Sequence, residues 1–289
     1  MTLHGYIIEK YNCMNNAYTC NRLVSEAKKA GIDLQIIGIH DTILTQQGIF
    51  NNEKQLKSCD FVINRYKWGI TKDEINKLAS KTYNSIEQFN IYINKYEQVK
   101  NLHSSAFIIP KYCMGTSLLS YEYLADSLGT PFVAKGLESS MGNEIFLVEN
   151  KAFYKELADK DKYGQDKEWL FEEFISSSFG RDIRFYSIRG NVVACMQRKS
   201  KADFRANVAL GACVEPYEIT PQIRQIARDI YDQTKLDFLG IDLLFGTDKP
   251  YFCEINVMPG LEGIETSSGI NIAKLIIDTI KGDFADDKN

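Results

Sequence analysis

In the first third of the chain, short runs of apolar residues alternate with stretches in which apolar residues recur at helical spacing. The short runs predict three strands, at 6–8, 34–39 and 61–64. Between the first two, apolar residues recur at the spacing of a helix over 16–30, which Gly31 ends. A polar loop separates the second strand from the third, and this alternation predicts an open α/β domain. The first strand is followed by YNCMNN rather than a glycine-rich phosphate loop, so a dinucleotide-dependent enzyme is a weak alternative.

The middle of the chain predicts helices and then a strand-rich region. From about Lys72 the pattern becomes helical, with Ile75, Leu78 and Ala79 on one face. Two further helices are predicted, at 89–99 and at 117–128, the second closed by Gly129. Then follow a strand at 131–135, a loop at 136–143, a strand at 144–148, a charged helix at 151–167 and a strand at 169–175.

The last third predicts two hairpins and two helices. In the first hairpin, DIRFYSI and VVACMQR flank the turn at 189–191. In the second, an apolar strand through Leu244 and one through Phe252 flank the turn at 246–250. The predicted helices are 221–234, opened by proline at its first position, and 271–281, followed by a frayed tail.

The composition is typical of a globular protein in water. The 289 residues are 44% hydrophobic and 25% charged, and the mild net charge of −4 indicates no polyanion-binding surface. No apolar run reaches the length of a membrane span, and the N-terminus lacks a signal-peptide pattern. Seven cysteines without a C-x-x-C pair favour reduced thiols. We therefore expect a cytoplasmic protein that binds neither nucleic acid nor membrane.

The second hairpin carries a set of oxygen ligands. Asp242 and Glu254 are equally far in sequence from Asp248, so a simple antiparallel register places them opposite each other. Asn256, two residues after Glu254, points to the same face. Carboxylate and amide oxygens are hard ligands that suit Mg²⁺, which keeps water and phosphate oxygens as its other ligands. A solvated polar face is the alternative; for the three residues together, magnesium is favoured.

Two segments upstream have chemistry that suits a nucleotide. Lys135 ends a predicted strand, where it can meet phosphate oxygens while the backbone N–H groups of loop 136–143 fold over them. A surface lysine beside an ordinary loop is an equal alternative. Glu172 and Glu173 lie in an apolar strand, where alternation lets only one of them face inward. The inward acid can accept a hydrogen bond from a ribose or an adenine amino group; an edge strand with one solvated acid is the simpler interpretation.

Positive charge gathers around the first hairpin. The end of its second strand and the following loop contain Arg198, Lys199, Lys201 and Arg205. On the neighbouring strand, Asp182, Arg184 and Tyr186 share one face. Each cation alone is typical of a solvated basic face. Their concentration in a chain of net negative charge suits a polyphosphate that carries magnesium.

Taken together, these motifs resemble the ATP-grasp superfamily, and more narrowly its RimK-type ligases. Those enzymes add glutamate to the C-terminus of a ribosomal protein, and their relatives join amino acids to peptides or carrier proteins. The resemblance is carried by PFVAK and its loop, EEFI, GRDIRFY, QRKSKADFRAN, GIDLL and CEINVMPGLEGIE followed by GINIA. It runs from about Asn94 to Ile280; over residues 1–90 it rests mainly on AYTCNRLVSEAKKAG.

The resemblance implies a three-part fold with ATP held between two antiparallel-sheet subdomains. The implied domains are 1–90, an N-terminal α/β domain, 91–170, the central ATP-grasp subdomain, and 171–289, the C-terminal subdomain with the magnesium site. The implied ATP-binding residues are Lys95 and Lys135 at the phosphates, Glu173 and Phe174 at the adenine hinge, Asp182 on the ribose side, and Arg205 and Asn207 near the phosphates and metal. Asp242, Glu254 and Asn256 would bind two magnesium ions, with manganese as an alternative metal. Lys135 and Arg198 would stabilise the transferred phosphate, and Arg198 also the tetrahedral intermediate.

The activity implied is an ATP-dependent carboxylate–amine ligase. A carboxylate attacks the γ-phosphorus of ATP, and an amine then attacks the resulting acyl phosphate; such chemistry depends on positioning and charge neutralisation. The substrates would be an amino acid such as glutamate together with a protein or peptide, or a peptide that is crosslinked, and a homodimer or homotetramer is suggested. After Asn207 the chain reads VALGA where the ribosomal ligases have a basic, glycine-rich stretch, so the acceptor stays open. The alternative function is a non-catalytic ATP-binding regulatory or scaffolding module.

Overall fold

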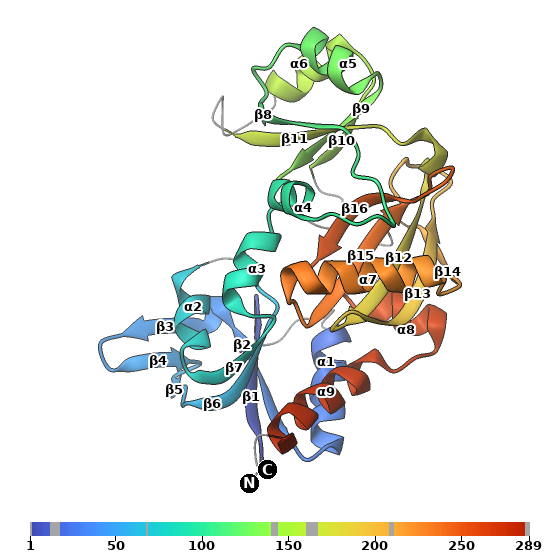
Figure 1. Ribbon diagram of the computed structural model, residues 1–289. Coiled ribbons are helices and arrows are strands. Elements are labelled where there is room, and N and C mark those ends of the chain that lie inside the picture. Colours follow the sequence, from blue (N-terminus) through green and yellow to red (C-terminus); the bar gives the residue numbers. More distant parts are fainter. Residues whose placement is uncertain are drawn as a thin grey trace.

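The computed structural model describes residues 2–11, 18–67, 69–139, 144–159, 167–207 and 211–286. This part of the chain forms a parallel sheet, a small antiparallel sheet beside it, and two larger antiparallel sheets (Figure 1). The predicted fold class is confirmed: an open α/β domain precedes two antiparallel-sheet subdomains.

Four parallel strands form the N-terminal sheet, in the spatial order β2-β1-β6-β7. They are β1 (His4–Glu9), β2 (Asp33–Gly38), β6 (Cys59–Asn64) and β7 (Ala79–Tyr83). Helix α1 (Tyr18–Lys29) connects β1 to β2 and buries Leu23 and Ala27. Gly31 follows the helix with a φ of 76°, a conformation that glycine adopts at low cost. The sequence prediction for this unit is therefore confirmed.

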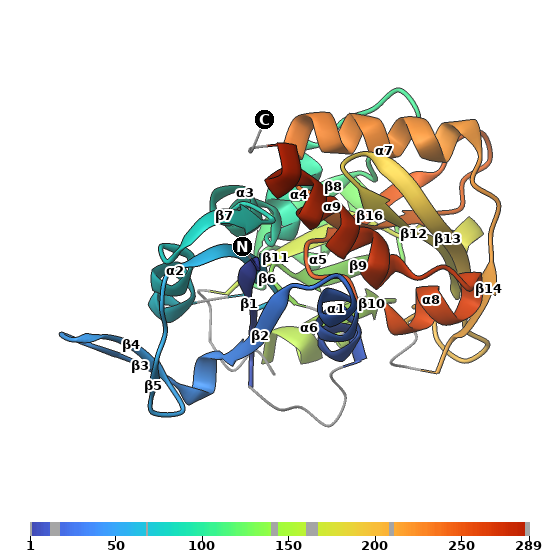
Figure 2. The same cartoon turned by 90° about the horizontal axis from the view of Figure 1, so that it is seen from below.

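The prediction of a polar loop between the second and third strands is wrong. The segment instead forms a 3₁₀ turn (Ile39–Asp41) and a three-stranded antiparallel sheet, β3 (Thr42–Thr45), β4 (Gly48–Asn51) and β5 (Lys54–Gln55). This sheet projects from the N-terminal domain (Figure 2). Its strands are short and largely exposed, so they lack the alternation of buried and exposed positions from which a strand is predicted.

Two helix predictions after residue 70 are wrong in their extent. Helix α2 (Ile70–Asn76) stops before Leu78, and Ala79 begins β7 by pairing with Cys59 of β6. The stretch predicted as one helix at 89–99 is two, α3 (Ile86–Tyr92) and α4 (Lys95–Asn101). Asn94 separates them because its Oδ1 accepts hydrogen bonds from the N–H groups of residues 96 and 97, at 2.9 and 3.4 Å, and so caps α4.

The central subdomain is an antiparallel sheet covered by two helices (Figure 1). Its strands, in spatial order, are β10 (Ile145–Val148), β9 (Phe132–Gly136), β11 (Glu168–Glu173) and β8 (Tyr112–Thr116). The helices are α5 (Tyr121–Leu128) and α6 (Lys151–Asp159), and they pack on Phe132 and Phe171. α5 starts four residues later than predicted because Ser120 caps its first turn. Residues 160–166 of the predicted charged helix lie outside the described residues.

The C-terminal subdomain is a five-stranded antiparallel sheet. Its strands, in spatial order, are β14 (Cys213–Pro216), β13 (Asn191–Lys199), β12 (Arg181–Ile188), β15 (Phe238–Leu244) and β16 (Tyr251–Asn256). A 3₁₀ turn (Ser176–Ser178) leads into β12. Helix α7 (Pro221–Thr234), capped by Thr220, buries Ile226 and Ile230 against the sheet. Both predicted hairpins are confirmed, and Arg189 and Gly190 make the first turn with φ values of 48° and 77°.

The C-terminal helices bring the last residues of the chain back to the N-terminal domain. They are α8 (Glu262–Ser268) and α9 (Ile272–Asp286), and α9 lies beside α1 in both views (Figures 1 and 2). The frayed tail predicted after residue 281 is wrong for residues 282–286, which continue α9. Phe284 packs against Phe61 of the parallel sheet with 6.2 Å between ring centroids, so these residues have tertiary contacts that local pattern does not predict.

No helix in the described ranges combines the length and the apolar character that crossing a bilayer requires.

Candidate functional site

A cavity lies where the central and C-terminal sheets face each other. Nine of the eleven residues predicted for ATP, metal and catalysis line it: Lys135, Glu173, Phe174, Asp182, Arg198, Arg205, Asn207, Asp242 and Glu254. Lys95 contacts one of these residues, and Asn256 lies farther along β16. The strands β9, β11, β12, β13, β15 and β16 supply most of the lining, so residues scattered over more than a hundred positions meet at one place.

The register of the second hairpin agrees with the sequence prediction. Asp242 of β15 pairs directly with Glu254 of β16, and Asn256 pairs with Gly240. The ladder shifts after Asp242, where a β-bulge separates this carboxylate pair from Leu243. Asn256 Oδ1 accepts a hydrogen bond from Met258 N at 2.9 Å, so its amide oxygen also shapes the turn that leaves the strand.

Two guanidinium groups neutralise Asp242. Arg184 donates to both of its carboxylate oxygens at 2.6 and 2.5 Å, and Arg198 Nη2 donates to Oδ2 at 2.7 Å. Arg198 also binds Asp182 through two hydrogen bonds of 2.7 and 2.6 Å. Burial alone would raise the pKa of Asp242, but Arg184 and Arg198 outweigh it and hold that pKa below its usual value. Asp242 is therefore a carboxylate at neutral pH.

The donor set fits a magnesium site. Asp242 and Glu254 present facing carboxylates, and cations already surround them: Lys95 Nζ is 3.5 Å and Arg184 Nη2 is 4.0 Å from Glu254. No cluster of three or more His, Cys, Asp or Glu side chains suited to a metal occurs in the described ranges, so an ion here would need the asparagine or a substrate oxygen as a further ligand. Hard oxygen ligands of this kind are those that Mg²⁺ prefers.

A buried ion pair forms the opposite wall. Lys135 of β9 binds Glu172 of β11, and both side chains are less than 10% exposed. Burial lowers the pKa of Lys135, but the Glu172 carboxylate more than offsets this and raises it. Glu172 Oε1 is buried and has no hydrogen-bond partner among the described residues. A buried acceptor of this kind can take a hydrogen bond from a bound ligand.

Glu172 is not among the predicted ATP-binding residues, although a signal for it exists in the sequence. Alternation allows one of Glu172 and Glu173 to face inward, and Glu172 is the buried one. Because Leu170 pairs with Lys135, Glu172 two residues later lies on the same face as the lysine. Glu173 lines the cavity as well, and its Oε1 accepts a hydrogen bond from Lys111 N at 2.8 Å.

Aromatic and polar groups line the remaining part of the cavity. Phe174 contacts Phe179 and Phe204 edge-on, with ring centroids 6.2 and 6.3 Å apart. Arg205 is held by Asp203 through hydrogen bonds of 3.0 and 2.7 Å. Asn207 also reaches the cavity. In the VALGA segment that follows it, residues 208–210 lie outside the described part of the chain.

Two lysines bind the loop that follows β9. Lys95 Nζ donates to Ser139 O at 2.5 Å, and Lys67 Nζ donates to Glu138 O. Lys67, from the segment after β6, was missed because nothing in its local sequence separates it from a surface lysine. Burial and the nearby Lys95 charge lower the pKa of Lys67. Residues 140–143 of the predicted phosphate loop lie outside the described residues.

The chain is similar to known proteins over most of its length. A model of the RimK-like ATP-grasp domain matches residues 92–280. A probable alpha-L-glutamate ligase of Thioalkalivibrio sulfidiphilus is 36% identical over 161 residues, 55% of this chain and 53% of that relative, so this match spans about half the relative's length. A probable alpha-L-glutamate ligase of Methanococcoides burtonii is 28% identical over 277 residues, 91% of each chain.

The solved structures agree on the fold. The ATP-grasp ligase PsnB, complexed with a minimal precursor, superposes with a TM-score of 0.71 at 16% identity, covering 97% of this chain and 99% of PsnB. At that identity the likeness concerns the fold alone. The family match covers most of the chain. This chain therefore belongs to the RimK-like ATP-grasp domain family.

Proposed function

We propose that this protein is an ATP-dependent carboxylate–amine ligase whose reaction takes place at the cavity between the central and C-terminal sheets. The single observation that carries the proposal is the pairing of Asp242 with Glu254 in the same cavity as Lys135 and Arg198. Facing carboxylates and buried cations are what a metal-bound polyphosphate requires. The family match and the named ligases among its relatives support this chemistry.

In this reaction a substrate carboxylate oxygen bonds to the γ-phosphorus of ATP, the bond to the β–γ bridging oxygen breaks, and ADP leaves. The amine then bonds to the carbonyl carbon of the acyl phosphate, inorganic phosphate leaves with the C–O bond electrons, and the nitrogen loses a proton. Magnesium, when bound, neutralises phosphate charge. Lys135 and Arg198 would stabilise negative charge that develops on the phosphoryl group, an effect that is large in a buried site.

The remaining lining residues are assigned to the nucleotide. Glu173 and Phe174 would contact the adenine, with Asp182 on the ribose side. Glu172 joins this set because its unpartnered Oε1 can accept a hydrogen bond from an adenine amino group or a ribose hydroxyl. Lys95, Arg205 and Asn207 would lie toward the phosphates. Asp242, Glu254 and Asn256 would hold two magnesium ions, with manganese as a substitute.

The substrate assignment is a further part of the proposal. The relatives are named probable alpha-L-glutamate ligases, and PsnB is described with a peptide precursor, in two cases together with Mg and ADP. We assign to this chain an amino acid such as glutamate joined to a protein or peptide, or a peptide that is crosslinked. We further propose the domain division 1–90, 91–170 and 171–289, and a homodimer or homotetramer.

The test is magnesium-dependent phosphate release from ATP in the presence of paired amino acids and short peptides. Release stimulated by one acid–amine pair, and abolished in Glu254→Ala, would support the ligase. The matched control is Glu168→Ala, which removes an exposed acid from β11 outside the cavity and should leave the rate unchanged. ATP binding without release across the panel, including protein acceptors, would favour a non-catalytic ATP-binding module instead.

A further inference from the structure

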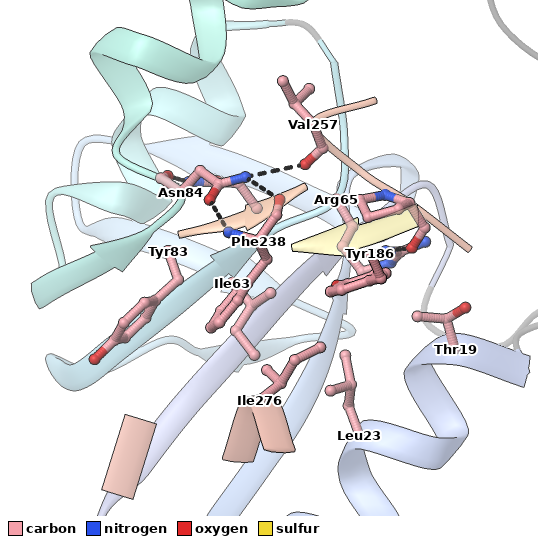
Figure 3. Close-up of a pocket in the computed structure, with 12 residues that line it drawn as sticks. Thr19, Leu23, Ile63, Arg65, Tyr83, Asn84, Tyr186, Phe238, Val257 and Ile276 are labelled. Atoms are coloured by element: carbon pink, nitrogen blue, oxygen red, sulfur yellow. Dashed lines mark hydrogen bonds between the residues drawn. The ribbon is translucent and has the colours of Figure 1, made fainter. Parts of the chain in front are cut away.

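Asn84 of the N-terminal domain holds the open end of the second hairpin (Figure 3). It follows β7, and its side chain bonds to Phe238, the first residue of β15, and to Val257, which follows β16. Asn84 Oδ1 accepts a hydrogen bond from Phe238 N at 2.8 Å, while Asn84 Nδ2 donates to Phe238 O at 2.9 Å and to Val257 O at 3.2 Å. One amide group thus joins the beginning of one strand to the end of the other.

This amide extends the hydrogen-bond ladder between the two strands. On the side away from the turn, the ladder reaches the pair of Gly240 with Asn256. Two residues before Gly240, Phe238 exchanges both its N–H and its carbonyl with the side chain of Asn84. Residues in the hydrogen-bonded pairs of an antiparallel sheet exchange the same two groups. Asn84 therefore acts as one further pair of the ladder, supplied by another domain.

Asn84 is itself fixed by a network of buried amides. It is 2% exposed, and its backbone carbonyl accepts a hydrogen bond from Asn64 Nδ2 at 3.1 Å. Asn64, the last residue of β6, exchanges two hydrogen bonds of 2.9 Å with Asn76 of α2. Buried polar networks whose hydrogen bonds are all made rigidify the structure around them. The N-terminal domain therefore gives the end of the hairpin a fixed point of attachment.

The facing carboxylates of Asp242 and Glu254 depend on the register of this hairpin. Toward the turn, the ladder shifts between Asp242 and Leu243, so a β-bulge adjoins the carboxylate pair on that side. Carboxylates that face each other on neighbouring strands repel, and a slip of one residue would turn one of them to the other face of the sheet. Asn84 opposes such a slip, because its amide bonds to both strands at once on the side away from the bulge.

We propose that Asn84 is a positioning residue for the metal site, which fixes the register of the second hairpin and so keeps Asp242 opposite Glu254. This role rests on the proposed function, in which the two carboxylates and Asn256 hold magnesium. The proposed ligands all come from the C-terminal subdomain. Through Asn84, the N-terminal domain also sets the affinity of the site for the metal.

The experiment measures metal binding and stability separately on the full chain. Mn²⁺ binding in the presence of ADP is followed by electron paramagnetic resonance for the wild type, Asn84→Ala and Asn84→Ser. The serine hydroxyl keeps part of the hydrogen-bonding capacity, so Asn84→Ser serves for the comparison if Asn84→Ala does not fold. Glu254→Ala shows the effect of losing a ligand. Urea unfolding gives the stability of each variant.

The matched control is Asn51→Ala. Asn51 is also a buried asparagine of the N-terminal domain, and its Nδ2 donates to Gly38 O at 3.1 Å and to Thr42 Oγ1 at 2.8 Å. These bonds lie within the N-terminal domain, so the substitution removes a comparable pair of hydrogen bonds without touching the second hairpin.

We expect Asn84→Ala and Asn51→Ala both to be less stable than the wild type, because each leaves buried polar groups without partners. The Asn84 variants alone should bind Mn²⁺ about tenfold more weakly, the lower end of the loss that follows when groups orienting metal ligands are removed. Phosphate release by Asn84→Ala should need about tenfold more Mg²⁺ and should approach the wild-type kcat at saturating Mg²⁺. A smaller fraction of folded protein would instead lower kcat at every Mg²⁺ concentration.

Mn²⁺ affinities of the Asn84 variants within about twofold of that of Asn51→Ala would overturn the positioning role, whatever their stability. No Mn²⁺ binding by the wild type would reject the metal site and the positioning role together. Metal binding that depends on both Asn84 and Glu254, without phosphate release from any substrate pair, would retain the positioning role and reject the ligase. Phosphate release with an unchanged Mg²⁺ requirement in Asn84→Ala would retain the ligase and reject the positioning role.

Discussion

Arg198 Nη2 lies 2.7 Å from Asp242 Oδ2, so a cation already occupies one side of the proposed metal ligand. The same guanidinium binds Asp182, and all three side chains are less than 10% exposed. Asp242 therefore keeps its charge before any metal binds. Arg198 therefore places a positive charge beside Asp242 whether or not a metal ion is bound.

Removing that cation should destabilise the fold. In Arg198→Met, Asp182 loses its two hydrogen bonds from Arg198, and Asp242 keeps only Arg184. Breaking a buried pair in this way costs about 3–5 kcal/mol. Urea unfolding should show this loss at pH 7, whereas the exposed Arg224→Met should unfold like the wild type. If the unfolding free energy of Arg198→Met lay within about 1 kcal/mol of the wild-type value, Arg198 would not have the stabilising role assigned to it here.

The Lys135–Glu172 pair predicts a pH-dependent affinity for ATP. Glu172 is what raises the pKa of Lys135 against the effect of burial. In Glu172→Gln the buried ammonium loses that support, so its pKa should fall and the lysine should become neutral as the pH rises above neutrality. ATP affinity of the variant should weaken with rising pH while that of the wild type stays constant. Parallel pH profiles for the two proteins would argue against this coupling.

The contact between Lys67 and the loop after β9 predicts that the N-terminal domain influences nucleotide binding. Its ammonium holds the loop after β9 through Glu138 O, close to Lys95. Lys67→Met should release this loop and raise KM for ATP several-fold. Lys77→Met, which removes an exposed lysine from the same domain, is the matched control. Steady-state kinetics with an unchanged KM in Lys67→Met would show that the contact is incidental.

The contacts of Asp283 predict how the free energy of unfolding changes as the pH falls. Arg189 donates to it at 2.7 and 2.5 Å, and Lys81 and Tyr83 also contact it, so its pKa is held below the usual value by these hydrogen bonds. A depressed pKa stabilises the fold above the ordinary aspartate pKa of about 4, and this contribution is lost as the pH falls through the folded value. Asp283→Asn should be less stable by about 1–2 kcal/mol near pH 6.

The check is urea unfolding of the wild type and Asp283→Asn from pH 6 to pH 3. The two curves should approach each other below about pH 4, since the wild-type carboxylate then becomes protonated on unfolding. A difference that stays constant over this range would mean that packing, and not the carboxylate charge, is responsible.

The sequence predicts those parts of the structure in which local pattern and tertiary contacts agree. Asp242 and Glu254 share one hairpin, so counting from its turn was enough to find their pairing. Alternation showed that one of Glu172 and Glu173 faces inward, but not which one, because that depends on Lys135 in another strand. The partners of Arg198 and Lys67 come from distant segments, which no local pattern brings together.

The errors have the same physical origin. Ala79 has helical spacing with Ile75, yet parallel pairing with β6 draws it into a strand. The residues after 281 look polar and terminal, yet Phe284 and Asp283 bind the N-terminal domain and extend α9. In each case long-range contacts outweigh local propensity.

The most direct test of the ligase is the transfer of oxygen from the acid substrate to phosphate. The acid–amine pair that gives the fastest phosphate release is used with its carboxylate labelled with ¹⁸O, and the phosphate is analysed by mass spectrometry. An acyl phosphate intermediate predicts one ¹⁸O atom in each phosphate formed with the amide product. Unlabelled phosphate formed at the same rate as the amide would show that the carboxylate never bonds to the γ-phosphorus, and would contradict the proposed mechanism.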